Sequence, residues 1–195
     1  NNSNTNAIMM ADFTVHNSVA LWDGQNFSGI FDGNGHTLDM DISGGNIGNV
    51  ALFRNGTGCT IKNLHLTGKI TGTDHVAGLV GYAGVANNKW TDIFNCRVSA
   101  SIESTGGMAG GFVGRGTNAN IQNSLFDGSI WCQKEQANGS QNWAGAFFGF
   151  RDGDVGSTVT NAAVRNCLEK ADWHNITHQH LNCKPWTFWG NGENS

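Results

Sequence analysis

The hydrophobic pattern of residues 60–70, TIKNLHLTGKI, changes its spacing at one point. Apolar side chains stand at Ile61, three positions later at Leu64, and two positions later at Leu66. A straight strand keeps a period of two, so a bend has to absorb the additional residue. Asn63 lies in this interval, and Asn tolerates the left-handed backbone conformation that a tight bend requires. The segment therefore predicts a short strand, a corner at Asn63 and a longer second strand.

The same pattern recurs along the chain: an apolar residue, any residue, Asn, and a small or apolar residue, followed by regular alternation. The corners are predicted at Asn63, Asn95, Asn123 and Asn161, in steps of 32, 28 and 38 residues. A fixed motif at irregular steps indicates one structural unit that is repeated with loops of variable length.

A Gly-rich apolar motif precedes each corner. It reads VAGLVG at residues 76–81, AGGFVG at 109–114 and AGAFFG at 144–149, with a degenerate NVALFR at 49–54. A last copy, TFWG at 187–190, closes the chain. Stacking these units predicts a column of inward-facing side chains at Leu52, Leu79, Phe112, Phe147 and Phe188. A second predicted column consists of Leu66, Val98, Phe126 and Val164. The corner Asn residues are predicted to form a hydrogen-bonded ladder, and the small residues to let the wall pack closely.

Units whose strands follow one another in the same order on successive turns pair in parallel, and such crossovers are right-handed. The prediction is an all-β fold, a right-handed parallel β-helix (β-solenoid) of about four to five coils. We expect one domain over residues 1–195, with an N-terminal cap and first coil (1–48), repeat coils (49–168) and a C-terminal coil or cap (169–195). The 28 Gly and the 13% of charged residues agree with a turn-rich β architecture.

Charge and cysteine content limit the partners and the disulfide bonds that can be expected. The net charge is −4 and the basic residues are scattered, so nucleic acid and anionic membranes are not expected partners. No apolar run is long enough to span a membrane. Five cysteines are an odd number for a disulfide framework, and Cys96 is expected to be a buried apolar residue. A disulfide among Cys132, Cys167 and Cys183 is conceivable, but the sequence does not choose the pair.

Several of these motifs occur together in a known family. The segment FSGIFDGNGHTL (27–38), the repeats of the VAGLVG type and the I-x-N corners resemble the GLUG-motif β-solenoid proteins, over roughly residues 7–166. The segment AIMMADFTV (7–15) resembles that family's opening strand, whereas residues 169–186 match nothing in the family. The resemblance implies a secreted or surface-anchored bacterial protein of the adhesin-like kind. It implies little about function, because the motif is a scaffold signature.

Alternation assigns the outward positions of the longer strand, and these form a polar face. On this face Trp131 is predicted to stand between Glu103 and Glu169, and Asp127 beside Arg165 in an exposed ion pair. An aromatic ring flanked by carboxylates suits a sugar ring and its hydroxyl groups. Glu103 and Asp127 are expected to lie one coil and two residues apart, about 8 Å by strand geometry.

That separation falls inside the window of an inverting glycosidase pair, about 6.5–9.5 Å, so Glu103 and Asp127 are also candidate catalytic residues.

The loops over residues 83–92, 131–143 and 151–158 are expected at one rim of the solenoid, where they carry Trp90, Trp131 and Trp143. Exposed Trp residues serve carbohydrate or protein contacts, although each could equally pack a loop against the body.

Metal chemistry has two candidate segments. His174, His178 and His180 could bind zinc, although H-E-x-x-H is not met and a polar cap is the alternative reading. Asp152 and Asp154 lie in a Gly-containing loop where calcium is conceivable, but the ligand set of an EF-hand is missing. We therefore expect no cofactor. The sequence also lacks a nucleophile elbow, a P-loop and a dinucleotide fingerprint.

Together these observations favour a non-enzymatic, secreted or cell-surface β-solenoid that binds a glycan or another surface component. The expected ligand-binding residues are Trp131, Glu103, Asp127, Arg165, Trp143 and Trp90. The alternatives are a polysaccharide-degrading enzyme, hydrolase or lyase, that uses the acidic residues of the same face, and a structural spacer within a larger surface protein.

Overall fold

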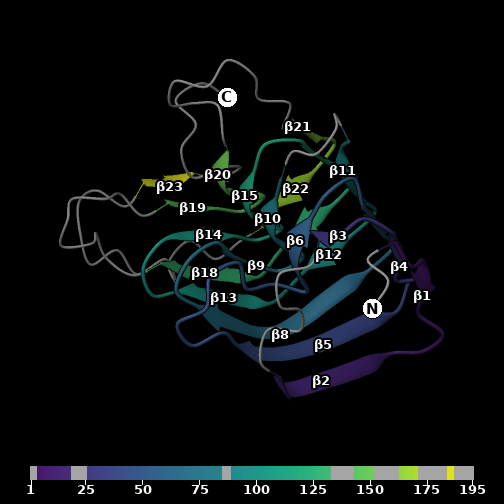
Figure 1. Ribbon diagram of the computed structural model, residues 1–195, viewed down its shortest axis with the longest axis horizontal. Helices are drawn as coiled ribbons and strands as arrows, with labels where there is room; N and C mark the ends of the chain where they lie inside the picture. The colour runs from purple at the N-terminus through teal and green to yellow at the C-terminus, as the bar shows by residue number, and fades with distance from the viewer. Residues whose placement is uncertain are drawn as a thin grey trace.

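The chain folds as an all-β solenoid of about four turns, in which parallel sheets run along the stack (Figure 1). The computed structural model describes residues 4–18, 26–84, 89–132, 143–151, 163–170 and 184–186. All strand pairs within these ranges are parallel, as the recurrence of the motifs predicted. The predicted fold class is therefore confirmed.

Two of the sheets flank the predicted Asn corner. Sheet A consists of β1 (Ala7–Ile8), β4 (Ile30–Asp32), β7 (Thr60–Lys62), β11 (Thr91–Phe94), β16 (Ala119–Gln122) and β21 (Ala163–Arg165). Sheet B consists of β2 (Phe13–Ser18), β5 (Thr37–Ser43), β8 (His65–Gly72), β12 (Arg97–Val98), β13 (Ser101–Ser104), β17 (Leu125–Phe126), β18 (Ser129–Cys132) and β22 (Leu168–Glu169).

The Gly-rich motif forms the other two sheets, which meet at a tight turn. Sheet C consists of β3 (Asn26–Phe27), β6 (Phe53–Gly56), β10 (Val80–Ala83), β15 (Val113–Gly116) and β20 (Phe148–Arg151). Sheet D consists of β9 (Val76–Ala77), β14 (Met108–Gly110), β19 (Trp143–Gly145) and β23 (Lys184–Trp186). One coil therefore passes from sheet A through the Asn corner into sheet B, then through sheets D and C.

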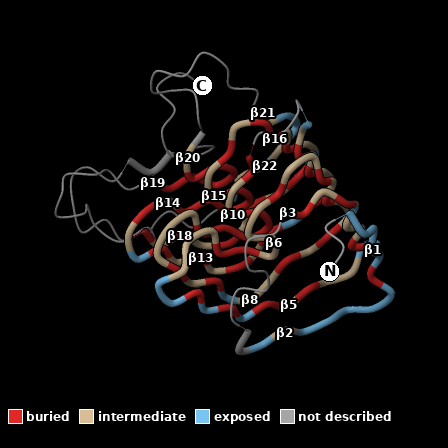
Figure 2. Tube along the Cα trace, in the orientation of Figure 1, coloured by how far each residue is buried: buried red, intermediate tan, exposed pale blue. Residues whose placement is uncertain are grey.

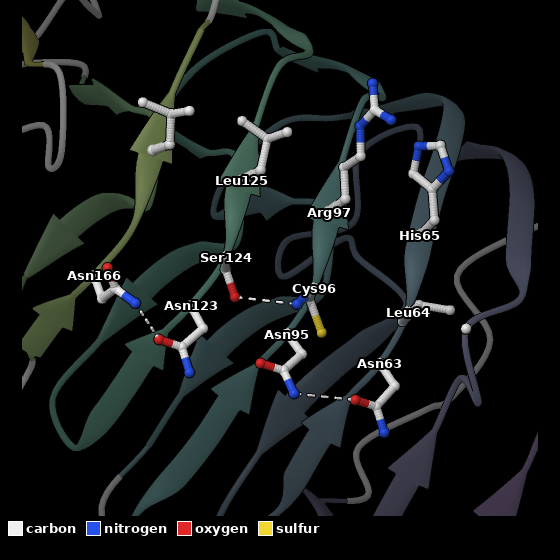
Figure 3. A pocket seen from close by; sticks show the side chains of 12 residues that line it. Asn63, Leu64, His65, Asn95, Cys96, Arg97, Asn123, Ser124, Leu125 and Asn166 are labelled. Carbon is white, nitrogen blue, oxygen red and sulfur yellow. Dashed lines mark hydrogen bonds between the residues drawn. The ribbon is translucent and has the colours of Figure 1, made fainter.

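The corners between sheets A and B are made by Asn residues in the left-handed conformation. Asn63, Asn95 and Asn123 have φ angles of 53°, 54° and 48°. Figure 3 shows their side chains stacked along this corner, with a hydrogen bond from Asn95 Nδ2 to Asn63 Oδ1 of 3.3 Å. The chain bends here from sheet A into sheet B, and Asn is among the residues that tolerate the positive φ of the bend.

The prediction for the last corner is wrong. The residue in this position is Asn166, with a φ of 50° and a hydrogen bond from its Nδ2 to Asn123 Oδ1 of 2.6 Å. Val164 accordingly pairs with Ile121 in sheet A and does not extend the column of Leu66, Val98 and Phe126.

Two similar tripeptides compete for this corner, VTN at 159–161 and VRN at 164–166. Both are followed by a small residue, Ala162 and Cys167, so the local sequence does not separate them. Pairing of Val164 with Ile121 selects the second tripeptide. Asn161 itself lies outside the described residues. The sequence step from Asn123 to Asn166 is 43 residues, so the last coil carries a longer insertion than expected.

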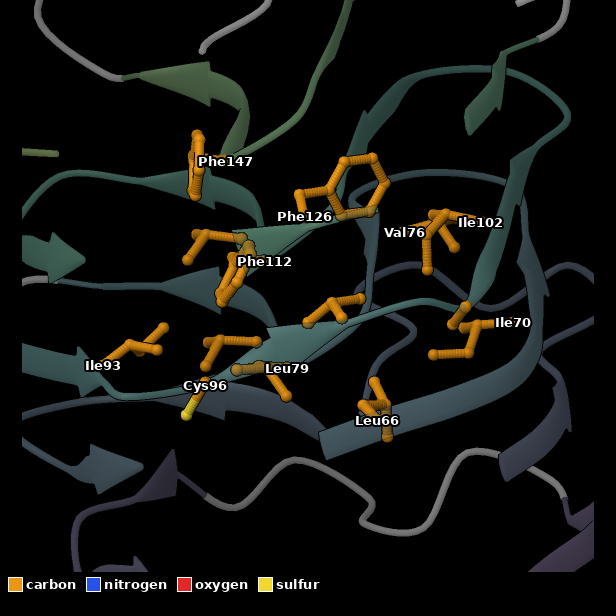
Figure 4. Close-up of a cluster of buried hydrophobic side chains, with 14 of the residues drawn as sticks. Leu66, Ile70, Val76, Leu79, Ile93, Cys96, Ile102, Phe112, Phe126 and Phe147 are labelled. Atoms are coloured by element: carbon orange, nitrogen blue, oxygen red, sulfur yellow. The ribbon is translucent and has the colours of Figure 1, made fainter. Parts of the chain in front are cut away.

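The interior is filled by apolar side chains in columns, as Figure 4 shows for the centre of the solenoid. Leu79, Phe112 and Phe147 are fully buried, and the rings of Phe112 and Phe147 stack at 5.2 Å. Leu66, Val98 and Phe126 form a second buried column in sheet B. Figure 2 shows that burial is greatest in the middle coils, whereas β2 at the N-terminal edge is exposed. Phe188, the predicted end of the first column, lies outside the described residues.

Glycines in sheet C pack against the backbone of the preceding coil. A Cβ atom on Gly81 would lie 2.6 Å from the carbonyl carbon of Asn49, and one on Gly114 would lie 2.6 Å from that of His75. A Cβ atom on Gly149 would lie 2.6 Å from the carbonyl oxygen of Gly114. The last Gly of the motif is therefore required by a close approach of two backbones.

The opening segment covers the first coil with two strands, where the sequence suggested one. β1 pairs with β4 in sheet A, and β2 pairs with β5 in sheet B.

The described part of the chain contains no helix with the length and apolar character of a membrane span. No disulfide joins the cysteines of this part, Cys59, Cys96, Cys132 and Cys167, to one another, which excludes a Cys132–Cys167 pair. Cys183 lies outside the described residues.

Replacing a corner Asn by a β-branched residue should destabilise the solenoid. Asn95→Val places a branched side chain at a φ of 54° and should lower the free energy of unfolding by about 1–3 kcal/mol. Asn95→Gly accepts the same φ and should change it by less than about 1 kcal/mol. Urea unfolding followed by circular dichroism measures both, and equal stability of the two variants would contradict the role of the corner.

The close approach at Gly114 gives a second test. Gly114→Ala should destabilise the protein by about 1–3 kcal/mol, because the added methyl group overlaps the His75 carbonyl. Gly48→Ala is the matched control, since its Cβ would meet nothing closer than 3.9 Å. Thermal unfolding of the two variants should separate them clearly, and a stable Gly114→Ala protein would refute the packing requirement.

Candidate functional site

The outward side chains of sheet B form four columns across the coils, because the strands are in register and alternate in and out. The column nearest the Asn corner contains Thr37, His65, Arg97, Leu125 and Leu168. The next two contain Asp39, Thr67, Ser99 and Asp127, and then Asp41, Lys69, Ser101 and Ser129. The column farthest from the corner contains Ser43, Thr71, Glu103 and Trp131.

Trp131 and Glu103 are direct neighbours, as predicted. They are paired in register between β18 and β13. With Ser101 and Ser129 they line a shallow hollow of about 330 Å³ on the outer face of sheet B. Lys69 Nζ contacts Glu103 Oε1 at 2.8 Å and orients the carboxylate. The hollow thus combines an indole ring, a carboxylate and two hydroxyl groups.

Two predicted neighbours are absent from this arrangement. Glu169 is in register with Phe126, so it does not stand beside Trp131. Arg165 belongs to β21 in sheet A, in register with Gln122, so it does not pair with Asp127. Both errors follow from the misassigned corner of the last coil.

The two candidate catalytic carboxylates are too far apart for an inverting pair. Asp127 lies opposite Ser99, and Glu103 lies four residues farther along the same coil. Strand geometry then separates the two positions by about 14 Å. The expected 8 Å is therefore wrong, and the pair falls outside the window of about 6.5–9.5 Å.

Asp127 instead belongs to a polar network that the sequence did not predict. Arg97 Nε donates to Asp127 Oδ2 at 3.0 Å, and Ser99 Oγ donates to Asp127 Oδ1 at 2.6 Å. His65 Nε2 lies 2.9 Å from Ser99 Oγ and completes the chain of contacts. The register of three coils brings these residues together, and no local motif marks them.

The surroundings of this network lower the pKa of Asp127 and that of His65, which favours the ionised carboxylate and the neutral imidazole. Burial opposes the ionisation of Asp127, but hydrogen bonds from Arg97 and Ser99 outweigh it and lower its pKa. Burial lowers the pKa of His65, and the nearby Arg97 charge lowers it further. The network therefore carries one paired positive and one paired negative charge.

The three Trp residues singled out in the sequence do not share one rim. Trp131 lies on sheet B, whereas Trp143 lies in β19 of sheet D. The centroids of the Trp143 and Phe150 rings lie 5.9 Å apart. The Arg115 guanidinium lies 5.7 Å from the Phe150 ring and 5.6 Å from the Tyr82 ring. Trp90 directly precedes β11 of sheet A. Only Trp131 therefore stands beside Glu103.

The candidate metal ligands His174, His178 and His180 and the loop residues Asp152 and Asp154 lie outside the described residues. Among the residues that are described, no three His, Cys, Asp or Glu side chains cluster as a metal site would require. The cysteines of the interior are poor nucleophiles. Burial raises the pKa of Cys59 to about 11 and that of Cys96 to about 12.

No protein-family model, curated protein or solved structure matches the chain. The resemblance to the GLUG-motif proteins therefore depends on the motifs alone.

The ion pair of Asp127 predicts a specific pH dependence. Because the pKa of Asp127 is lower in the folded state than the value of about 3.9 in an unfolded chain, its stabilising effect is present above about pH 4. It is lost as the pH falls through the folded-state pKa. Asp127→Asn should therefore lower the denaturation midpoint at pH 7, and this deficit should shrink toward pH 3. Guanidinium unfolding across this range measures it, and a deficit independent of pH would contradict the ionic origin.

Proposed function

We propose that the chain is a carbohydrate-binding module of a secreted or cell-surface, adhesin-like β-solenoid protein, and that a sugar ring stacks on Trp131. The observation that supports this proposal is the hollow in which Trp131 lies beside Glu103, with Ser101 and Ser129 also in its lining. An indole ring offers an apolar face to the C–H groups of a sugar, while the carboxylate and hydroxyl groups hydrogen-bond its hydroxyls.

The rigidity of the scaffold favours such a shallow site. Ser101, Glu103, Ser129 and Trp131 are carried by strands that pair with neighbours in register, and Lys69 holds the Glu103 carboxylate in place. Little conformational freedom is then lost on binding, so a small number of contacts suffices for a weak but selective interaction. Several such contacts along one surface protein add up by multivalency.

The separation of the carboxylates removes the main support for the enzymatic alternative. A polysaccharide-degrading enzyme acting through Glu103 and Asp127 needs both groups at one glycosidic bond, and the register places them about 14 Å apart. A purely structural spacer, the remaining alternative, would not need an aromatic ring next to a carboxylate on an outer face. Binding therefore explains this feature better than either alternative.

A glycan array tests the proposal with wild-type protein and the Trp131→Ala variant. We expect the wild type to bind a subset of glycans, and the variant to bind them about tenfold more weakly, since an aromatic contact contributes up to about 1.5 kcal/mol. Trp90→Ala is the matched control and should bind like the wild type, because Trp90 directly precedes β11 of sheet A and does not line the hollow. Absence of glycan binding by the wild type, or binding that is unchanged in Trp131→Ala, would refute the proposal.

A further inference from the structure

A second concave site lies along the Asn corner, on the side of sheet B farthest from Trp131. It is a groove of about 650 Å³ between sheets A and B, which we call the Asn-corner groove. Its lining includes Asn63, Asn95, Asn123 and Asn166 on one side and Arg97 and Leu125 on the other (Figure 3). The groove crosses the coils, and three steps of about 4.8 Å make the row of amides about 14 Å long.

The amide ladder in this groove is interrupted at its centre. Asn63 donates to Asp32 Oδ1 at 3.0 Å, Asn95 donates to Asn63, and Asn166 donates to Asn123. Within the described part of the chain no hydrogen bond joins Asn95 to Asn123, and Figure 3 shows the two dashed bonds on either side of this gap. Asn95 Oδ1 and Asn123 Nδ2 therefore offer an acceptor and a donor in the middle of the groove.

The charges around the groove cancel. Among the described residues that line it, the one cation is Arg97, whose Nε and Nη2 contact the Asp127 carboxylate. His65 also lines the groove, and burial together with the charge of Arg97 lowers its pKa, which favours the neutral imidazole. An anionic or cationic ligand would gain little here. The site suits a ligand without net charge that both donates and accepts hydrogen bonds.

The opposite side of the groove carries two leucines next to Arg97 and His65. Leu125 and Leu168 are in register in sheet B, and Leu168 is 54% exposed. An amide row facing a pair of leucines matches an oligosaccharide, whose hydroxyl groups suit the amides and whose C–H faces suit the leucines. An extended peptide fits less well, because its rise of about 3.3 Å per residue does not follow rungs about 4.8 Å apart.

We propose that the Asn-corner groove is a second carbohydrate site, which binds a neutral oligosaccharide lying across the coils between the Asn row and the leucines. This site does not include Trp131, so it can be tested independently of the site proposed above.

The side-chain amide signals of Asn95 and Asn123 report on the groove by ¹⁵N NMR, and the indole N–H signal of Trp131 reports on the other site. Cellohexaose, xylohexaose and mannohexaose are the neutral probes, titrated to millimolar concentration into the ¹⁵N-labelled chain. A galacturonate hexamer and a polyserine peptide are the acidic and peptide comparisons. We expect at least one neutral probe to shift the Asn95 and Asn123 amides.

A variant tests the contacts themselves. Asn95→Gly combined with Asn123→Gly keeps the positive φ of both corners and removes both amides, so the dissociation constant of that probe should rise at least about tenfold. Asn34→Gly is the matched control: Asn34 also has a positive φ, 52°, but does not line the groove. It should leave the affinity unchanged. Backbone amide spectra establish that each variant is folded.

The outcomes separate the two proposals. Shifts of the Trp131 indole alone would support the site on Trp131 and overturn the one at the Asn corner, whereas shifts of the two Asn amides alone would do the reverse. Shifts of these amides only with the galacturonate hexamer or only with the peptide would also overturn the inference. An unchanged affinity of the Asn95→Gly, Asn123→Gly variant for the neutral probe would overturn the inference as well.

Discussion

Parallel pairing in register between successive coils is the constraint on which the rest of this structure depends. Each coil has to turn at the same places as its neighbours, since a corner displaced by one residue would invert every inward and outward side chain that follows. Asn63, Asn95, Asn123 and Asn166 meet this requirement on one side of the solenoid through their positive φ angles. On the other side, Gly81, Gly114 and Gly149 meet it by letting two backbones approach closely.

The same stacking creates the chemistry of the outer face. Residues separated by about one coil of sequence become neighbours, as His65, Ser99 and Asp127 do in a single hydrogen-bonded chain. Ion pairs such as Lys69 with Glu103 likewise connect adjacent coils. The inner strands of sheet B are paired on both edges, and β18, which carries Trp131, pairs with β13 among the described strands. A surface built on paired strands is stiff, and stiffness suits shallow recognition.

The two proposed sites lie at opposite ends of the sheet B strands. Leu125 begins β17 beside the Asn corner, and Trp131 lies six residues farther along, a distance of about 20 Å by strand geometry. The Arg97–Asp127 pair lies near the Asn corner, between the Asn row and the Trp131 hollow. A short oligosaccharide would therefore occupy one site or the other, and a longer chain crossing the face would reach both.

The sequence by itself determined the solenoid, its corners at Asn63, Asn95 and Asn123, the inward columns of the middle coils and the register of Trp131 with Glu103. These features follow from local rules, the period of two along a strand and the small set of residues that tolerate a positive φ. Only the tertiary structure decided between Asn161 and Asn166, because the two tripeptides are locally alike and pairing with β16 selects the second. It alone placed the Arg97 guanidinium on Asp127, because that contact depends on side-chain conformation. The separation of Asp127 from Glu103 already follows from the predicted register, in which Trp131 stands beside Glu103 and four residues after Asp127.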